Sequence, residues 1–431
     1  MMEIKNILYI LIFCVGLLVY FVKPKWLFLY WLSMQPFILA VYFFFFPAQA
    51  GPDLLLHPIY FGYTKPLSYL VVFICILSLV KKKKELLHIT VVIPIVLLSL
   101  FMVFQFVYKN STVSGLYGNI KDVIFCSAPC LLLILCPKVR PNRNSVITFI
   151  CFFVIVQLVF CIMNSFGFRI YSAAFDYSDF SNNLISGTFA RYNHMTNYLS
   201  SFFLVLLYAY FEDRSINKLL FIITSLIIGT IILFSGSRMS IVLFVFLSLF
   251  YVFYHNRKHI VKLSLVVLLL IVIFPLLANN DLFYGQKEDS GTGFERNVLG
   301  ITNIINSSDL SEGSTIAYSL YLFNYKSTDI LFGNGVSYSN HKYYEDNVFT
   351  DVGAYKSDAR YAFMIVEYGI IGFMLYMMLF YLMFKQLVIR FHKKQLLLYV
   401  CLCYYLLFGV TDEGFFDIMQ CSIPFIYSSS H

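Results

Sequence analysis

The sequence is short of charge. Only 13% of its 431 residues are Asp, Glu, Lys or Arg, while 60% are hydrophobic and the mean hydropathy is +0.77. A soluble domain usually has about 25% charged residues, so this chain has too little polar surface to cover a water-soluble globule. The composition excludes an ordinary cytosolic enzyme, a disordered chain and a secreted scaffold held by disulfides. It indicates a polytopic membrane protein.

Motifs for nucleotide and metal binding are also missing. No GxxxxGK[ST] phosphate-binding loop occurs in the chain, which argues against an ATP-driven pump. All ten cysteines lie in apolar stretches. Cys126 with Cys130, and Cys401 with Cys403, lack His or acidic residues at the spacing of metal ligands. We therefore expect neither a metal nor another cofactor.

The chain does contain many long apolar segments. A helix that crosses a bilayer needs about 20 such residues. Twelve spans are predicted, or thirteen if the short stretch 414–427 also crosses: 6–22, 26–46, 63–80, 86–108, 120–136, 145–166, 196–211, 218–235, 239–254, 260–278, 360–384 and 396–411. The predicted fold is an all-α polytopic membrane protein. It has ten membrane helices over 1–278, one large loop over 279–359, and further membrane helices over 360–431.

Basic residues are distributed unevenly between the two sides of the membrane. Most of the 31 lysines and arginines lie in one set of alternating loops, which includes Lys81 to Lys84. Because basic loops usually stay in the cytoplasm, the N-terminus and the loop 279–359 are predicted to face outward. The net charge of +8 is thus mainly a feature of topology and does not indicate nucleic-acid binding.

Three arginines at predicted outer helix ends run against this distribution. Arg238 lies in FSGSRMS between two apolar spans, Arg191 lies in SGTFARYNHMTNYL before another span, and Arg360 opens the span after the large loop. An arginine holds phosphate through paired hydrogen bonds and keeps its charge, and the start of a helix adds a weak anion site. We predict that the three bind a pyrophosphate. The alternative for each is an interfacial anchor paired with a carboxylate.

Tyrosines and polar residues are concentrated in segment 333–361. Aromatic faces stack on sugar rings, and amides, carboxylates and imidazoles bond to sugar hydroxyls. The predicted substrate-binding residues besides Arg360 are Tyr338, His341, Tyr343, Tyr344, Asn193 and His194. The alternative is a solvated loop with ordinary surface tyrosines.

A glycosyl acceptor hydroxyl needs a base to take its proton, and a carboxylate or imidazole can do this. Asp358 is the first choice because it lies between the tyrosine-rich segment and Arg360. Its alternative role is a carboxylate stabilised by the positive end of a helix dipole. The other candidate bases are His194, His341, Glu345, Asp346, Glu367, Asp412 and Glu413. Of these, Glu367, Asp412 and Glu413 could instead be buried partners of arginines.

The order of these features resembles the Wzy-type repeat-unit polymerases of the O-antigen ligase and polymerase superfamily. The motifs that carry the resemblance are GTFARYNH (187–194), SGSRMS (235–240), GNG (333–335) and SDARYAFMIVEYGIIG (357–372). The span count and the large outer loop late in the chain agree with it. One departure favours a polymerase over a ligase. The ligase branch commonly has a His–Asn pair at the loop exit, where this chain has Asp358 and Ala359.

The resemblance implies a metal-independent membrane glycosyltransferase with a GT-C-like fold in the bacterial cytoplasmic (inner) membrane. It would join glycan repeat units carried on undecaprenyl pyrophosphate into O-antigen (part of lipopolysaccharide) or capsular polysaccharide. Arg238 and Arg191 would hold the pyrophosphate with help from Arg360, and Asp358 or His194 would accept the proton. A chain-length regulator and a flippase would be its protein partners.

Three other functions stay open. An O-antigen ligase would share the fold and the donor but use a lipid A–core acceptor. A lipid-linked oligosaccharide flippase or other transporter is less favoured, because no repeat between the halves is visible and the ionisable residues gather at one face. The third is a receptor or scaffold without catalysis.

Overall fold

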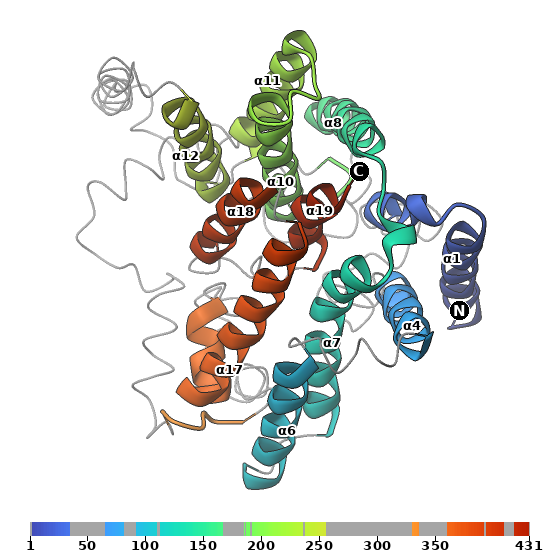
Figure 1. Cartoon of the computed structure of the whole chain (residues 1–431), viewed down its shortest axis with the longest axis vertical. Coiled ribbons are helices and arrows are strands. Elements are labelled where there is room, and N and C mark those ends of the chain that lie inside the picture. The colour runs from blue at the N-terminus through green and yellow to red at the C-terminus, as the bar shows by residue number, and fades with distance from the viewer. Residues whose placement is uncertain are drawn as a thin grey trace. The chain divides into compact units, whose positions relative to one another are not determined.

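The computed structural model describes residues 2–34, 65–81, 92–109, 113–166, 185, 187–189, 192–235, 238–255, 330–335, 360–391, 394–408 and 418–430 (Figure 1). Regular structure in these ranges is helical, with no strand, which confirms the predicted all-α class for them. The chain forms two compact units. One contains Met1–Leu67, Pro141–Ser307 and Ser430–His431, and the other contains Ser68–Arg140 and Ser308–Ser429.

The first unit is built around α10 (Tyr192–Phe211). This helix packs against α8 (Arg143–Ser165), α11 (Lys218–Ser235) and α12 (Arg238–His255), and every side chain from position 195 to position 209 is buried. Its buried face includes Ser200 and Ser201, which are small enough to let neighbouring helices approach closely. The unit also contains α1 (Met2–Val22), η1 (Pro24–Trp26) and a helix at 27–34.

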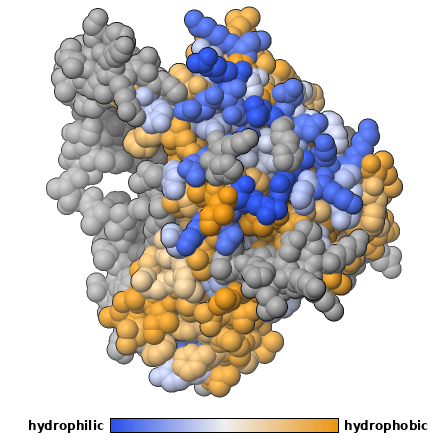
Figure 2. Space-filling model, in the orientation of Figure 1, coloured by the Kyte–Doolittle hydropathy of each residue, from blue (hydrophilic) through white to orange (hydrophobic). Residues whose placement is uncertain are grey.

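The second unit contains most of α4 (Lys65–Lys81), with α6 (Val92–Tyr108), α7 (Val113–Leu135), η4 (Pro137–Val139), α17 (Arg360–Arg390), α18 (Gln395–Phe408) and α19 (Ile418–Ser429). Helices α6, α7 and α17 pack on one another, and α19 packs on α7 and α18. Their outer surface is apolar, as Figure 2 shows where α6 and α17 lie at the bottom of the view. Leu100 of α6 and Met374 of α17 are among the exposed apolar residues. A surface of this kind suits contact with lipid tails.

Three described helices are long and apolar enough to cross a bilayer, judged by length and composition: Arg143–Ser165, Lys218–Ser235 and Glu367–Arg390. Shorter apolar helices occupy Tyr9–Val22, Leu67–Val80, Val92–Tyr108 and Met195–Phe211. A helix overlaps each predicted span that has described residues, whereas 260–278 lies outside the described part. The count of twelve or thirteen spans, the GT-C-like architecture and the predicted domain boundaries stay predictions.

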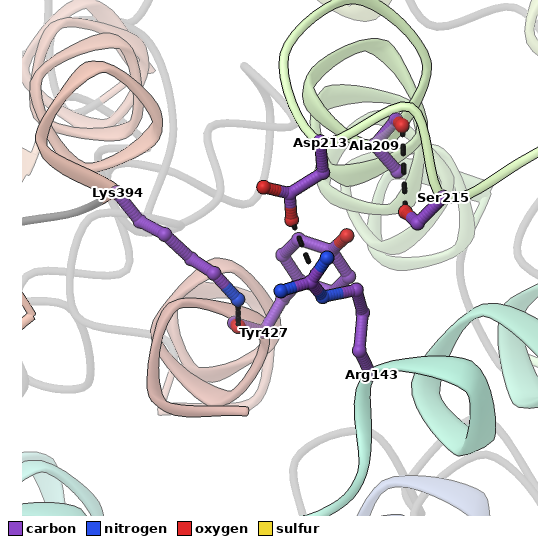
Figure 3. A network of polar contacts seen from close by, with 6 residues as sticks. All are labelled: Arg143, Ala209, Asp213, Ser215, Lys394 and Tyr427. Atoms are coloured by element: carbon purple, nitrogen blue, oxygen red, sulfur yellow. Dashed lines mark hydrogen bonds and ion pairs between the residues drawn. The ribbon is translucent and has the colours of Figure 1, made fainter. Parts of the chain in front are cut away.

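Two cations of loops predicted to face the cytoplasm make contacts at the ends of helices. In the second unit, the buried Lys394 donates from Nζ to the carbonyl of Tyr427 near the end of α19 (2.9 Å, Figure 3). A cation at this position compensates the negative end of the helix dipole. In the first unit, Arg143 Nε lies 3.5 Å from Asp213 Oδ2, which connects the start of α8 to the turn after α10 (Figure 3). These cations therefore serve the fold.

Helix α17 is interrupted at Gly369, where φ is 66° and ψ is −175°. Segment 330–335 docks against this interruption. The N–H of Gly335 donates to the carbonyl of Glu367 (3.1 Å), and the N–H of Ile370 donates to the carbonyl of Ile330 (2.9 Å). The GNG motif and the Glu-x-Gly-x-x-Gly motif of the sequence therefore form one structural element.

The fully buried Gln105 of α6 completes this element. Its side-chain amide donates to the carbonyls of Phe332 and Glu367. Glycine is needed at both contact points, because a Cβ on Gly333 would collide with the backbone of Glu367 and one on Gly369 would collide with the backbone of Leu331. The interruption of α17 is thus enclosed by backbone on one side and by a buried amide on the other.

We expect Gly369→Ala to destabilise the protein by about 1–3 kcal/mol, because φ and ψ at this position are accessible essentially only to glycine. Gly229→Ala in α11 is the matched control, since its Cβ would meet only the ring of Phe244, at 3.1 Å, without positive φ. Thermal unfolding of the detergent-purified variants measures both effects. Equal melting temperatures for Gly369→Ala and the wild type would contradict this account of the interruption.

Candidate active site

The starts of α10 and α12 lie side by side. Ser240, in the first turn of α12, donates from Oγ to Thr196 Oγ1 of α10 at 2.9 Å, and Asn197 Oδ1 lies 3.4 Å from the same hydroxyl. All three side chains are buried. Because Ser240 is two residues after Arg238 and Thr196 is five residues after Arg191, this contact brings the ends of the two arginine-bearing segments together.

A short connection between α11 and α12 reverses the direction of the chain. Helix α11 ends at Ser235 and α12 begins at Arg238, so only residues 236 and 237 separate them. Helix α11 packs against both α10 and α12. Further along, the rings of Phe203 and Phe244 stack with centroids 4.2 Å apart, which continues the parallel alignment of α10 with α12. Both helices therefore begin at the same end of the unit.

The segment that leads into α10 is anchored by buried amides. Thr188 and Gln157 of α8 form two hydrogen bonds: the Thr188 N–H donates to Gln157 Oε1 (3.0 Å), and Gln157 Nε2 donates to Thr188 Oγ1 (2.6 Å). The N–H of Gly187 donates to Asn164 Oδ1 at 2.9 Å. The first residues of the GTFARYNH motif are therefore part of the interior of this unit, and the motif divides into a buried anchor and a helix start.

Several predicted site residues lie at described helix starts, although their side chains are outside the described part. Arg238 is the first residue of α12, and Asn193 and His194 lie in the first turn of α10. Arg360 is the first residue of α17, in the second unit. The remaining predicted residues lie outside the described ranges: Arg191, Asp358, Tyr338, His341, Tyr343 and Tyr344. The roles of all these residues stay predictions.

Among the other candidate bases, Glu367 is described. It is only 1% exposed, and its carbonyl belongs to the contacts at the interruption of α17. This placement favours the structural role over that of a base open to substrate. His194 has its backbone in α10, while Glu345, Asp346, Asp412 and Glu413 lie outside the described ranges.

Sequence reasoning missed the polar residues that hold these segments in place. Gln157, Cys161 and Asn164 follow one another at i, i+4 and i+7, so they share one face of α8. Polar residues at helical spacing in an otherwise apolar span were a signal for buried contacts with a neighbouring segment. Ser240 carried no such signal, because its partner Thr196 is distant in the sequence and only the packing of the helices joins them.

Residues 223–377 match a family model described as O-antigen ligase. The matched range begins in α11 and includes Arg238, the predicted outer loop, the GNG motif and the first part of α17. No curated protein matches the chain significantly. The match supports the resemblance to the O-antigen ligase and polymerase superfamily. Together with the apolar helices, it supports a membrane protein of O-antigen-related glycan biosynthesis.

The hydrogen bond between Ser240 and Thr196 should show an energetic coupling. In a double-mutant cycle with Ser240→Ala and Thr196→Val, we expect a coupling of about 0.6–1.5 kcal/mol, as for other interhelical hydrogen bonds in membrane proteins. The control cycle combines Thr196→Val with Ser248→Ala. Ser248 is on the same helix as Ser240 but donates within that helix, to the carbonyl of Phe244 (2.7 Å). Unfolding in detergent measures both cycles. Equal coupling in the two cycles would contradict the interhelical contact.

Proposed function

We propose that this chain polymerises oligosaccharide repeat units carried on undecaprenyl pyrophosphate, at the outer face of the bacterial cytoplasmic membrane. The observation that carries the proposal is the paired start of α10 and α12, held by Ser240 and Thr196. It joins two segments that the sequence marks with outward arginines, Arg191 and Arg238. The match of residues 223–377 to the O-antigen ligase family supports the same class of donor.

The reaction is a displacement at an anomeric carbon. A hydroxyl at the non-reducing end of the incoming unit attacks the anomeric carbon of the growing glycan. The new glycosidic bond forms as the bond to the pyrophosphate oxygen breaks, and undecaprenyl pyrophosphate leaves. Asp358 or His194 accepts the hydroxyl proton. Arg191 and Arg238 stabilise the negative charge that develops on the leaving group, and Arg360 assists them.

The large outer loop supplies the sugar-binding groups in this proposal. Tyr338, Tyr343 and Tyr344 provide aromatic faces for the rings of the glycan, and His341 and Asn193 bond to its hydroxyls. A chain-length regulator and a flippase act beside the protein. Neither metal nor cofactor takes part, because the arginines fill the role of a cation at the pyrophosphate.

An O-antigen ligase is the second candidate, since the matching family model is described by that activity. Asp358 and Ala359 stand where the ligase branch commonly has a His–Asn pair, and this difference favours the polymerase. The two functions differ in the acceptor. It is another lipid-linked repeat unit for a polymerase and lipid A–core for a ligase.

The lipid-linked oligosaccharides of a strain that lacks this gene separate these functions. Loss of a polymerase should leave single repeat units on the lipid carrier at the outer face. Loss of a ligase should leave long chains that are not transferred, and loss of a flippase should leave units on the inner leaflet. Mass spectrometry of the extracted lipids gives the chain length. Long glycan on the carrier in the deletion strain would exclude the polymerase.

Arg238→Ala should abolish chain growth, because it removes the charge that neutralises the leaving pyrophosphate. Arg238→Lys should restore little activity, because an ammonium group cannot form the paired hydrogen bonds of a guanidinium. The control is Arg390→Ala, at the exposed end of α17 in a region predicted to face the cytoplasm. Complementation of the deletion strain at equal protein level measures glycan length. Full-length glycan with Arg238→Ala would reject this role.

A further inference from the structure

We propose that Gln157 is a positioning residue for the reaction. It fixes segment 187–189 and thereby sets the place from which Arg191 meets the pyrophosphate. The inference rests on the proposed function for the role of Arg191. The placement of the segment itself rests on contacts of described residues.

The contact between Gln157 and Thr188 uses both ends of the amide. The carbonyl oxygen accepts the backbone N–H of Thr188, and the NH₂ group donates to the Thr188 hydroxyl. Both side chains have no exposed surface. Two bonds in opposite directions fix the orientation of the amide as well as the distance, so residue 188 has little freedom to slide or turn.

Gly187 shows how closely this amide approaches the segment. The glycine has φ +59°, in the left-handed region, and a Cβ at this position would collide with Gln157 Oε1 and lie 2.9 Å from Met195 Sδ. Its N–H donates to Asn164 Oδ1, which lies two turns further along the same face of α8 as Gln157. Position 187 therefore requires glycine, because α8 and α10 leave no room for a side chain there.

Phe189 completes the anchor from the other side. Its ring centroid lies 6.3 Å from that of Phe153 on α8 and 5.3 Å from that of Tyr198 on α10, and the side chain is 8% exposed. Only residues 190 and 191 separate Phe189 from Tyr192, the first residue of α10. In the sequence, Arg191 thus lies between the fixed segment 187–189 and the start of the buried helix α10. Because only residues 189 and 190 separate Thr188 from Arg191, we expect a displacement of Thr188 to move Arg191 as well.

Packing alone does not require this amide. Leucine has a similar volume and would suit an apolar helix better. Some buried hydroxyls of the unit bond to their own helix, as Thr224 does to the carbonyl of Leu220 at 2.8 Å, with a longer contact to Cys151 Sγ at 3.8 Å. Gln157 instead bonds to non-helical backbone three residues before Arg191, an arginine predicted to lie on the substrate side. This difference assigns it a positioning role.

The test compares hydroxyl and amide variants in proteoliposomes supplied with a purified lipid-linked repeat unit. Gln157→Leu and Thr188→Val should lower kcat about 10-fold to 100-fold with little change in KM, as expected when a reacting group is displaced by about 1 Å. Thr188→Ser keeps the hydroxyl and should stay within about 2-fold of the wild type. Thr224→Val is the matched control and should leave kcat unchanged. Equal losses for Thr188→Val and Thr224→Val would overturn the positioning role.

A double variant identifies the residue through which Gln157 acts. If it acts through Arg191, the combination of Gln157→Leu with Arg191→Ala should be no slower than Arg191→Ala alone. Multiplied losses in the double variant would overturn this route.

A second readout does not depend on catalysis. A spin label on Arg191→Cys, in a background whose accessible cysteines are replaced, should give a broader distribution of environments after Gln157→Leu and an unchanged spectrum after Thr224→Val. An unchanged spectrum after Gln157→Leu would overturn the positioning of the segment. If the wild-type protein does not elongate glycan, while the spectrum of the labelled Arg191→Cys protein still responds to Gln157→Leu, the proposed function is rejected and the anchor is retained.

Discussion

Backbone polar groups within the apolar part of this protein have no water to bond to, and each interruption of a helix therefore needs a partner from the protein itself. Two fully buried glutamines meet this requirement. In the first unit, Gln157 bonds to the non-helical residue Thr188. In the second unit, Gln105 bonds to the carbonyls of Phe332 and Glu367 at the interruption of α17. An amide suits this task because it can donate and accept hydrogen bonds without carrying a charge that would be costly to bury. Gln157 uses both groups, whereas Gln105 bonds to the described residues through its NH₂ group alone.

This constraint explains why the motifs of the sequence are short and rich in glycine. Gly187, Gly333 and Gly369 all have positive φ, and at each of them a Cβ would collide with a neighbouring atom. These residues are where irregular backbone passes close to a helix. In GTFARYNH, the anchor precedes the residues with charge and hydrogen-bonding capacity. The resemblance to the O-antigen ligase and polymerase superfamily therefore rests partly on residues that build the scaffold and only partly on residues that would touch substrate.

The sequence predicted the all-α class because long apolar runs of this kind fold only as helices in a bilayer. It also predicted the starts of α12 and α17 to within a residue or so, because Arg238 and Arg360 follow polar or glycine-containing segments. The interruption of α17 was missed, since Gly369 lies in an apolar run and its conformation depends on segment 330–335. Helix α10 begins at Tyr192, four residues before the predicted span and shortly after segment 187–189, which is held by hydrogen bonds to α8. Such contacts between distant segments are not encoded in local periodicity.

The directions of α10, α11 and α12 have an electrostatic consequence. Helix α11, which lies between the other two in the sequence, runs antiparallel to them. Helices α10 and α12 therefore run in parallel and begin at the same end, as the contacts of Ser240 with Thr196 and of Phe203 with Phe244 show. Each helix start carries a partial positive charge, and the sequence adds an arginine at or beside each start. In the proposed site these arginines lie beside the two helix starts, and like charges that lie close together repel one another unless an anion lies between them. The buried hydroxyl contact of Ser240 with Thr196 holds the two helix starts together. Under the proposed function, a pyrophosphate between the arginines would reduce this repulsion, and the stabilisation would be largest when the leaving group carries its full charge.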